Sequence, residues 1–225
     1  LWGETAEKEG RAPARFSPQM DPLGSGSDYT AFLDHLGVPS LDAGFGGRYG
    51  VYHSIYDDFT WMERVCDPEF LTHTMAARLY TVIAMRAAAA DVVPMTFVPY
   101  AEVLRDEVDD LRRIVERKAR AADPAQGKTP FEFKGLPRLV DAIKTFRERA
   151  EALDRASKAL AGRDGVDDAK LARVNDALTR IERAFLLPAG LPGRPWFKHA
   201  VYAPGVTTGY ASWPLPGVRQ AILET

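Results

Sequence analysis

The sequence holds a single cysteine, Cys66, among its 225 residues, which excludes a framework of intramolecular disulfide bonds. It also lacks any uninterrupted apolar run of about 20 residues, the length that a membrane-spanning helix requires. The richest apolar stretch, residues 75–93, is broken by Arg78 and Arg86. A large excess of one sign of charge is missing as well, since 29 basic residues face 31 acidic ones. A formal net charge of −2 gives no general electrostatic reason to bind nucleic acid or acidic membranes.

What remains is the composition of an ordinary globular protein, with 46% apolar and 27% charged residues. A chain of this length can bury a sizeable core in one or two domains. Internal repeats and low-complexity tracts are missing. The hydrophobic pattern changes near residues 94–99, and this change predicts a boundary between two regions.

The first region mixes short elements of different kinds. Asp28 can cap a short helix, and Gly37 suits the C-terminal end of that helix. Residues 38–45 then predict a short strand, and a glycine-rich loop follows at 44–47. The expected apolar face of the short helix consists of Tyr29, Phe32, Leu33 and Leu36.

A longer helix is predicted to begin near residues 67–69, with Asp67 as its cap and Pro68 near its first position. Its expected apolar face consists of Phe70, Leu71, Met75, Leu79, Val82 and Ile83. A strand and helices in this order are typical of a partial α/β domain.

The second region is predicted to be helical almost throughout. Apolar residues recur at helical spacing in three stretches, which end near residues 123–127, at 164–165, and near 185. The middle helix is expected to have about 25 residues, and a last short helix should follow Pro216. Long amphipathic helices joined by short turns predict an antiparallel bundle. The apolar positions are Leu104, Val108, Leu111 and Val115; then Leu136, Leu139, Val140, Ile143, Phe146, Ala150, Leu153 and Leu160; then Leu171, Val174, Leu178, Ile181 and Phe185.

Two short motifs in the first region carry chemical information. The segment GSGSD occupies residues 24–28, and the segment YHSIYDD occupies residues 52–58. A Gly/Ser turn, a short helix, an apolar strand and a loop with a Tyr-His pair would place an imidazole at the edge of a sheet. Further segments of the same kind are ERAF at 182–185, GLP at 190–192, RP at 194–195, HAVYAP at 199–204, YA at 210–211 and PG at 216–217.

In order and spacing these segments resemble the C-terminal part of the glutamate carboxypeptidase II and transferrin receptor family of zinc exopeptidases. The resemblance implies that residues 1–93 complete an α/β zinc peptidase domain. It implies that residues 94–225 form a transferrin-receptor-like helical domain that pairs two copies into a homodimer. The intact protein would then be a dizinc exopeptidase, with its remaining zinc ligands and its catalytic base upstream of Leu1. The isolated chain is expected to be inactive.

The same resemblance implies a role for each site residue. His53 would be a zinc ligand, and the Tyr52 hydroxyl would donate to the tetrahedral intermediate. The turn residues Ser25, Gly26 and Ser27 would line the substrate cleft, and Tyr210 of the helical domain would contribute to the pocket for the terminal side chain of the substrate. Two zinc ions could lower the pKa of a shared water and polarise the scissile carbonyl.

The sequence departs from the glutamate-specific members at the positions that hold acidic substrate groups. Asp42 and Gly44 stand where those enzymes have arginines, Gly209 stands in place of a lysine, and Ser27 stands in place of an asparagine. Without guanidinium and ammonium partners a glutamate side chain would be held poorly, although Arg48 could substitute from the loop. The expected substrates are therefore peptides or amino-acid conjugates without a strict requirement for C-terminal glutamate.

Other interpretations stay open at this point. A lone loop histidine is usually a surface residue, and Tyr52 or Tyr210 could serve in packing alone. His199 is expected to be a structural hydrogen-bonding residue, while His35 and His73 are expected to face solvent or cap helices. The whole protein could also be a catalytically inactive receptor of the transferrin receptor type. The resemblance favours a secreted, periplasmic or other extracytoplasmic location.

Overall fold

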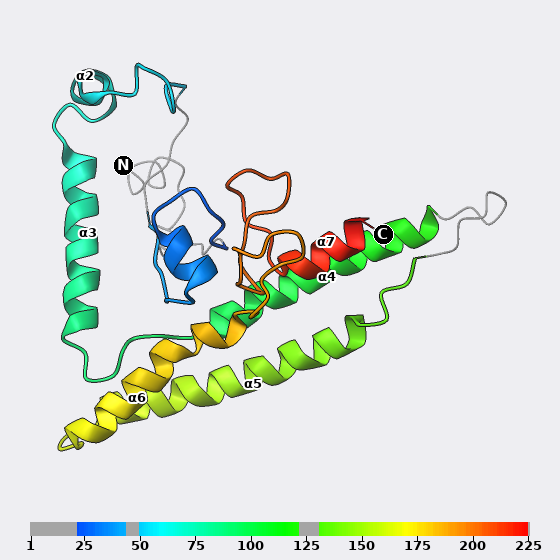
Figure 1. The fold of residues 1–225 in the computed structure, drawn as a ribbon. Coiled ribbons are helices and arrows are strands. Elements are labelled where there is room, and N and C mark those ends of the chain that lie inside the picture. Colours follow the sequence, from blue (N-terminus) through cyan, green and yellow to red (C-terminus); the bar gives the residue numbers. More distant parts are fainter. Residues whose placement is uncertain (1–21, 44–49, 122–130, 225) are drawn as a thin grey trace, which may run out of the picture.

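The computed structural model describes residues 22–43, 50–121 and 131–224, which are mostly helical (Figure 1). Within these ranges β-structure is limited to isolated bridges, such as the antiparallel pair Pro204 and Ser212. The helical elements are η1 (Ala31–His35), α2 (Phe59–Trp61), η2 (Met62–Cys66), α3 (Leu71–Ala88), α4 (Val98–Arg120), α5 (Leu136–Ala161), α6 (Asp168–Arg180), η4 (Glu182–Phe185) and α7 (Pro216–Glu224).

The short helix η1 ends where the sequence predicts, at Gly37. This glycine has φ +62°, and its N–H donates to the Leu33 carbonyl while the Val38 N–H donates to the Phe32 carbonyl. A left-handed glycine with this pair of bonds is a common helix C-terminus. The predicted apolar face is correct for Leu33, which is buried, but wrong for Phe32 and Leu36, which are exposed, and Asp34 is buried beside Leu33.

The strand predicted at 38–45 is not formed in its described part, because residues 38–43 have no regular structure. Residues 44 and 45, with the glycine-rich loop at 44–47 and Arg48, lie outside the described residues. A β-strand is stable only when a neighbouring strand satisfies its backbone groups, and the described residues supply no such neighbour. The α/β character expected for the first region is therefore not seen.

Helix α3 begins at Leu71, a few residues later than predicted, with Phe70 as its N-cap residue. Asp67, the predicted cap, bonds the first turn of the helix from further upstream. The Asp67 carboxylate accepts the Thr72 and His73 N–H groups at 3.3 and 3.0 Å, and the His73 imidazole at 2.7 Å. The bond from His73 is the main reason why the pKa of Asp67 lies below its usual range. None of the residues of α3 is buried.

Helices α4 and α5 run antiparallel and form the main packing contact of the molecule (Figure 1). The predicted stripe of α4 is correct, since Leu104, Val108 and Leu111 are buried in the core. Ile143 of α5 joins them, and the length of 26 residues for α5 agrees with the expectation. A smaller apolar cluster joins Leu178 of α6 to residues 92, 97 and 150.

Helix α7 begins at Pro216 as predicted and packs on α4. Arg219 of α7 donates to Glu107 of α4 at 2.8 Å through Nε and also bonds Asp110. The guanidinium lies over the Trp213 ring, 5.8 Å from its centroid. Burial raises the pKa of Glu107, while the bond from Arg219 lowers that of Asp110. This half-buried ion cluster fixes the C-terminal helix on α4.

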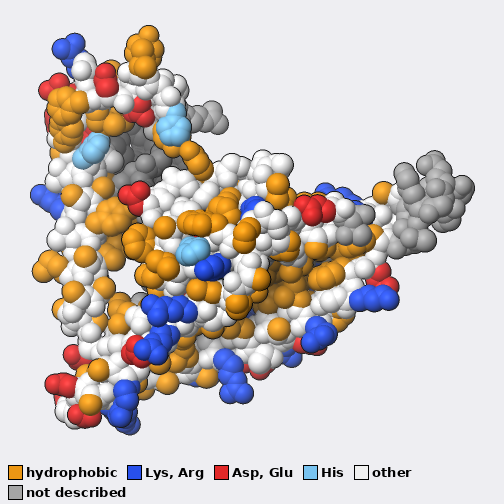
Figure 2. Space-filling model, viewed as in Figure 1, with side chains coloured by type: hydrophobic (Ala, Val, Ile, Leu, Met, Phe, Trp, Pro, Cys, Tyr) orange, Lys and Arg blue, Asp and Glu red, His pale blue; other side chains and the backbone are white. Residues whose placement is uncertain are grey.

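Apolar side chains are visible over the column formed by α3 and between α4 and α5, with Lys and Arg along the lower edge of α5 and α6 (Figure 2). The exposed apolar residues of α3 include Leu71, Met75, Leu79, Val82 and Met85. Among the described residues, no helix is both long enough and apolar enough to cross a membrane.

Candidate functional site

The Gly-Ser-Gly turn lies directly against Tyr210, which is far away in the sequence. The Ser25 N–H donates to the Tyr210 carbonyl at 2.9 Å. A Cβ placed on Gly26 would lie 2.4 Å from Cγ of the Tyr210 ring, and a Cβ on Gly24 would lie 2.2 Å from the Tyr210 carbonyl oxygen. Gly26 also has φ +91°, a conformation that L side chains rarely adopt. Glycine is therefore required for the turn to approach Tyr210.

The Tyr-His pair approaches the same tyrosine from another segment. The Tyr52 and His53 rings stack with centroids 3.9 Å apart, and the His53 ring meets the Tyr210 ring edge-on at 6.5 Å. His53 has φ +59°, a left-handed conformation that costs a residue other than glycine about 1 kcal/mol or more. Backbone strain of this kind is concentrated at functional sites.

The structure thus brings together five of the six predicted site residues: Ser25, Gly26, Tyr52, His53 and Tyr210. Tyr52 and Tyr210 are 57% and 59% exposed, so their rings form an open surface. The sixth residue, Ser27, follows Gly26 in the sequence and is exposed. Its carbonyl accepts the N–H and the hydroxyl of Thr30. These residues therefore lie close together, and their roles stay predictions.

An exposed imidazole is a suitable zinc ligand, and His53 fits that role by its chemistry. The described residues contain no group of three or more potential metal ligands. The described segments alone therefore do not assemble a complete zinc site around His53. The nearby Asp58 serves the backbone instead, because its carboxylate accepts the Trp61 N–H at 2.8 Å and caps α2.

One of the positions that depart from the glutamate-specific pattern leaves open space beside Tyr210. Gly209 precedes Tyr210 with φ +62°, and a Cβ there would meet no atom within 4 Å. Asp42 is exposed, while Gly44 and Arg48 lie outside the described residues. The Tyr210 ring therefore has no cation on its preceding residue to hold an acidic group.

The remaining histidines are bonded as structural residues. His35 Nδ1 donates to the Trp196 carbonyl at 2.7 Å, and its ring stacks on that of Trp196. His73 pairs with Asp67, as described above. His199 is 0% exposed and bonds Glu182 at 2.9 Å, which confirms the expectation of a hydrogen-bonding role.

One buried acid, Asp34, was not predicted from the sequence. Asp34 is 0% exposed, and neither of its carboxylate oxygens has a hydrogen-bond partner among the described residues. Burial raises the pKa of Asp34 from 3.8 to about 7. The only signal was its place between Leu33 and Leu36 in a short helix, and a helix-period pattern assigns such a position to solvent.

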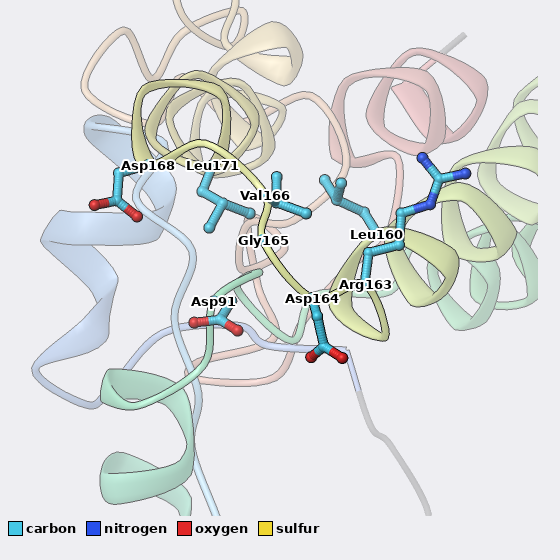
Figure 3. Close-up of a pocket in the computed structure, with 8 residues that line it drawn as sticks. All are labelled: Asp91, Leu160, Arg163, Asp164, Gly165, Val166, Asp168 and Leu171. Atoms are coloured by element: carbon cyan, nitrogen blue, oxygen red, sulfur yellow. The ribbon is translucent and has the colours of Figure 1, made fainter.

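A hollow of about 190 Å³ lies between the turn after α5 and the residues after α3 (Figure 3). It shares no residue with the Tyr210 cluster. Carboxylates without further ligands are normally solvated, so we assign it no role. Its lining is Asp91, Leu160, Arg163, Asp164, Gly165, Val166, Asp168 and Leu171.

Comparison with known proteins identifies the relatives of this chain. Residues 135–225 match the transferrin receptor-like dimerisation domain. The chain is 35% identical to a probable glutamate carboxypeptidase of Arabidopsis thaliana over 199 residues, which cover 88% of this chain and 26% of that protein.

Two further relatives carry different names. The chain is 28% identical to an aminopeptidase of Rattus norvegicus, over 88% of this chain and 26% of that protein. It is 24% identical to an inactive zinc metalloprotease of Schizosaccharomyces pombe, over 88% of this chain and 25% of that protein. The chain thus spans about a quarter of the length of the relatives it matches. On these similarities, the chain belongs to the transferrin receptor-like family of zinc exopeptidases.

Proposed function

We propose that this chain is the C-terminal part of a dizinc metallo-exopeptidase, similar to glutamate carboxypeptidases, that hydrolyses peptides or amino-acid conjugates. The observation that supports the proposal is the edge-on contact between His53 and Tyr210 beside the Gly-Ser-Gly turn. Three segments separated in sequence meet there, and each carries a residue that the family resemblance assigns to the site. Such convergence is not needed for packing, because the tyrosines remain exposed.

In the proposed site His53 would hold one zinc ion through a ring nitrogen. The two zinc ions, when bound, supply an activated water and polarise the scissile carbonyl. The Tyr52 hydroxyl donates a hydrogen bond to the oxyanion as it forms. Ser25, Gly26 and Tyr210, which lie directly against one another, together line the proposed substrate cleft.

The preference for the terminal side chain follows from the charges around Tyr210. A phenol ring next to Gly209 offers an apolar face and one hydroxyl group, without the cation that would hold a carboxylate. We therefore propose that substrates need not end in glutamate. The family resemblance also leads us to propose an extracytoplasmic location.

The 225-residue chain alone should bind zinc weakly and hydrolyse no peptide. It offers one ligand recognised by motif, whereas a dizinc site needs roughly six ligand groups and a general base. Metal analysis after dialysis, together with assays on a peptide library, measures both properties. The control is the protein extended upstream, which should bind two zinc ions and be active.

Stoichiometric, tightly bound zinc on the chain alone would contradict the proposed incomplete site. An extended protein that lacks zinc and activity would favour the alternative function, a catalytically inactive receptor or interaction protein. One relative of this chain, from S. pombe, is named an inactive zinc metalloprotease, so inactive proteins occur among the relatives of this chain.

We expect the purified chain to form a homodimer through its helical domain. The dimerisation domain matched at 135–225 and the half-buried apolar residues of α5, such as Leu139 and Val140, are the reasons. Light scattering over a range of concentrations should give twice the chain mass of 24.9 kDa. His53→Ala, outside the helical domain, is the control and should leave the mass unchanged. A strict monomer at tens of micromolar would contradict this prediction.

A further inference from the structure

Tyr210 lies at the tip of a small hairpin formed by residues 201–215. At its base the Trp213 N–H donates to the Ala203 carbonyl at 2.8 Å, and the Leu215 N–H donates to the Val201 carbonyl at 2.9 Å. Ala203 and Val201 are buried in the core. The hairpin therefore has a fixed base and carries its tyrosine outward to the Gly-Ser-Gly turn.

The side chain of His199 holds the start of this hairpin. Its Nδ1 accepts the N–H groups of Val201 and Tyr202 at 3.2 and 2.9 Å. Because Nδ1 accepts two donors, it carries no proton, and the ring proton must lie on Nε2. Nε2 then donates to Oε1 of Glu182 at 2.9 Å.

Glu182 connects this imidazole to the helical core. It begins η4, is 5% exposed, and its Oε1 also accepts the Tyr100 hydroxyl of α4 at 3.3 Å. Burial, followed by the nearby charge of Glu182, raises the pKa of Tyr100 and of Tyr202. Both phenols thus stay neutral donors or packing groups around the His199–Glu182 pair.

The backbone of His199 is bonded to a second segment of the site, the helix η1. The N–H groups of Lys198 and His199 both donate to the Asp34 carbonyl, at 2.8 and 3.1 Å. Asp34 belongs to η1, the helix that directly follows the Gly-Ser-Gly turn. One residue is therefore bonded through its side chain to the hairpin that carries Tyr210, and through its backbone to the helix behind Ser25 and Gly26.

We propose that His199 and Glu182 are positioning residues of the substrate cleft. They fix the separation between the Gly-Ser-Gly turn and Tyr210, although neither touches the substrate. The inference rests on the proposed function, because it assigns the pair a task at the proposed cleft. The hydrogen bond from the Ser25 N–H to the Tyr210 carbonyl forms only while this separation is kept, so exchange of the Ser25 amide measures it directly.

A matched pair of variants in the upstream-extended protein tests the proposal. His199→Asn keeps an oxygen at the Nδ1 position, whereas His199→Leu has the same branched shape without an acceptor. Both lose the contact with Glu182 equally. Amide hydrogen exchange of Ser25, Tyr202 and Trp213 and the kinetic constants KM and kcat are measured for each.

We expect His199→Leu to raise KM roughly tenfold relative to His199→Asn, with kcat changed much less, because two hydrogen bonds to the hairpin are lost. The Ser25 and Tyr202 amides should exchange roughly tenfold faster in the leucine variant. Equal KM and equal exchange in the two variants would overturn the proposal. If the leucine variant does not fold, Glu182→Gln replaces it.

Glu182→Gln keeps a neutral acceptor, which binds the Nε2 proton more weakly than a carboxylate does. It should accelerate exchange at Tyr202 and Ser25, and unchanged exchange at both would also overturn the proposal. Leu178→Ala serves as the stability control, since it weakens the separate cluster around α6 and should leave KM and Ser25 exchange unaffected. Should the extended protein lack activity, the proposed function fails, while the exchange data still decide the positioning role.

Discussion

Replacing His53 by alanine in the upstream-extended protein should remove zinc from one site and nearly abolish turnover. The imidazole is the ligand that this chain is proposed to supply, and a metal site that loses a ligand no longer holds its activated water in place. Metal content and kcat/KM measure the two effects. Full zinc occupancy with unchanged activity would remove His53 from the metal site.

The companion variant Tyr52→Phe separates binding from catalysis at the same site. It should keep zinc and substrate affinity but lower kcat by roughly 10²–10³-fold, since the hydroxyl is proposed to act on the oxyanion. The phenyl ring preserves the stacking on His53, whose ring centroid lies 3.9 Å from that of Tyr52. Unchanged turnover would exclude Tyr52 from the catalytic residues.

Replacing Asp34 by asparagine should raise the free energy of unfolding at neutral and alkaline pH. At pH 4 the same substitution should change the free energy of unfolding little. The folded protein holds the Asp34 carboxyl protonated up to about pH 7, whereas the unfolded chain releases the proton near 3.8. Between these values the unfolded state binds fewer protons, so the contribution of Asp34 to stability is lost as the pH rises. Above pH 7 the loss is complete.

The difference between the two pKa values limits the loss in the free energy of unfolding to at most about 4 kcal/mol. Urea unfolding followed by circular dichroism at pH 4, 5.5 and 8 measures how far the asparagine variant recovers it. Asp106→Asn is the control, because Asp106 is 69% exposed and its replacement removes no buried carboxyl. A constant difference between the Asp34 variant and the parent at all three pH values would contradict the buried, unpaired carboxyl.

Much of the helical region could be predicted because its local signals agree with its packing. The stripe of Leu104, Val108 and Leu111 faces the core as its spacing indicates. Gly37 ends η1, Asp67 bonds the first turn of α3 and Pro216 opens α7, because capping and turn chemistry act within a few residues. The candidate site residues came from the family resemblance rather than from periodicity, and their roles stay predictions.

The failures involve long-range contacts. The face of η1 is set by its bonds to residues 198–199, so Leu33 and Asp34 turn inward while Phe32 and Leu36 remain exposed. No local pattern encodes a partner so distant in the sequence. The expected strand at 38–43 fails for a similar reason, because a strand depends on neighbours that the described residues do not provide.

Helix α3 also has a consequence for the chain in a cell. A helix with exposed leucine, valine and methionine side chains along its length presents the kind of surface that chaperones and quality-control proteases bind. We therefore expect a free polypeptide of this length to be degraded quickly. If proteolysis released this segment, the segment would then be degraded and would not persist as a separate stable protein.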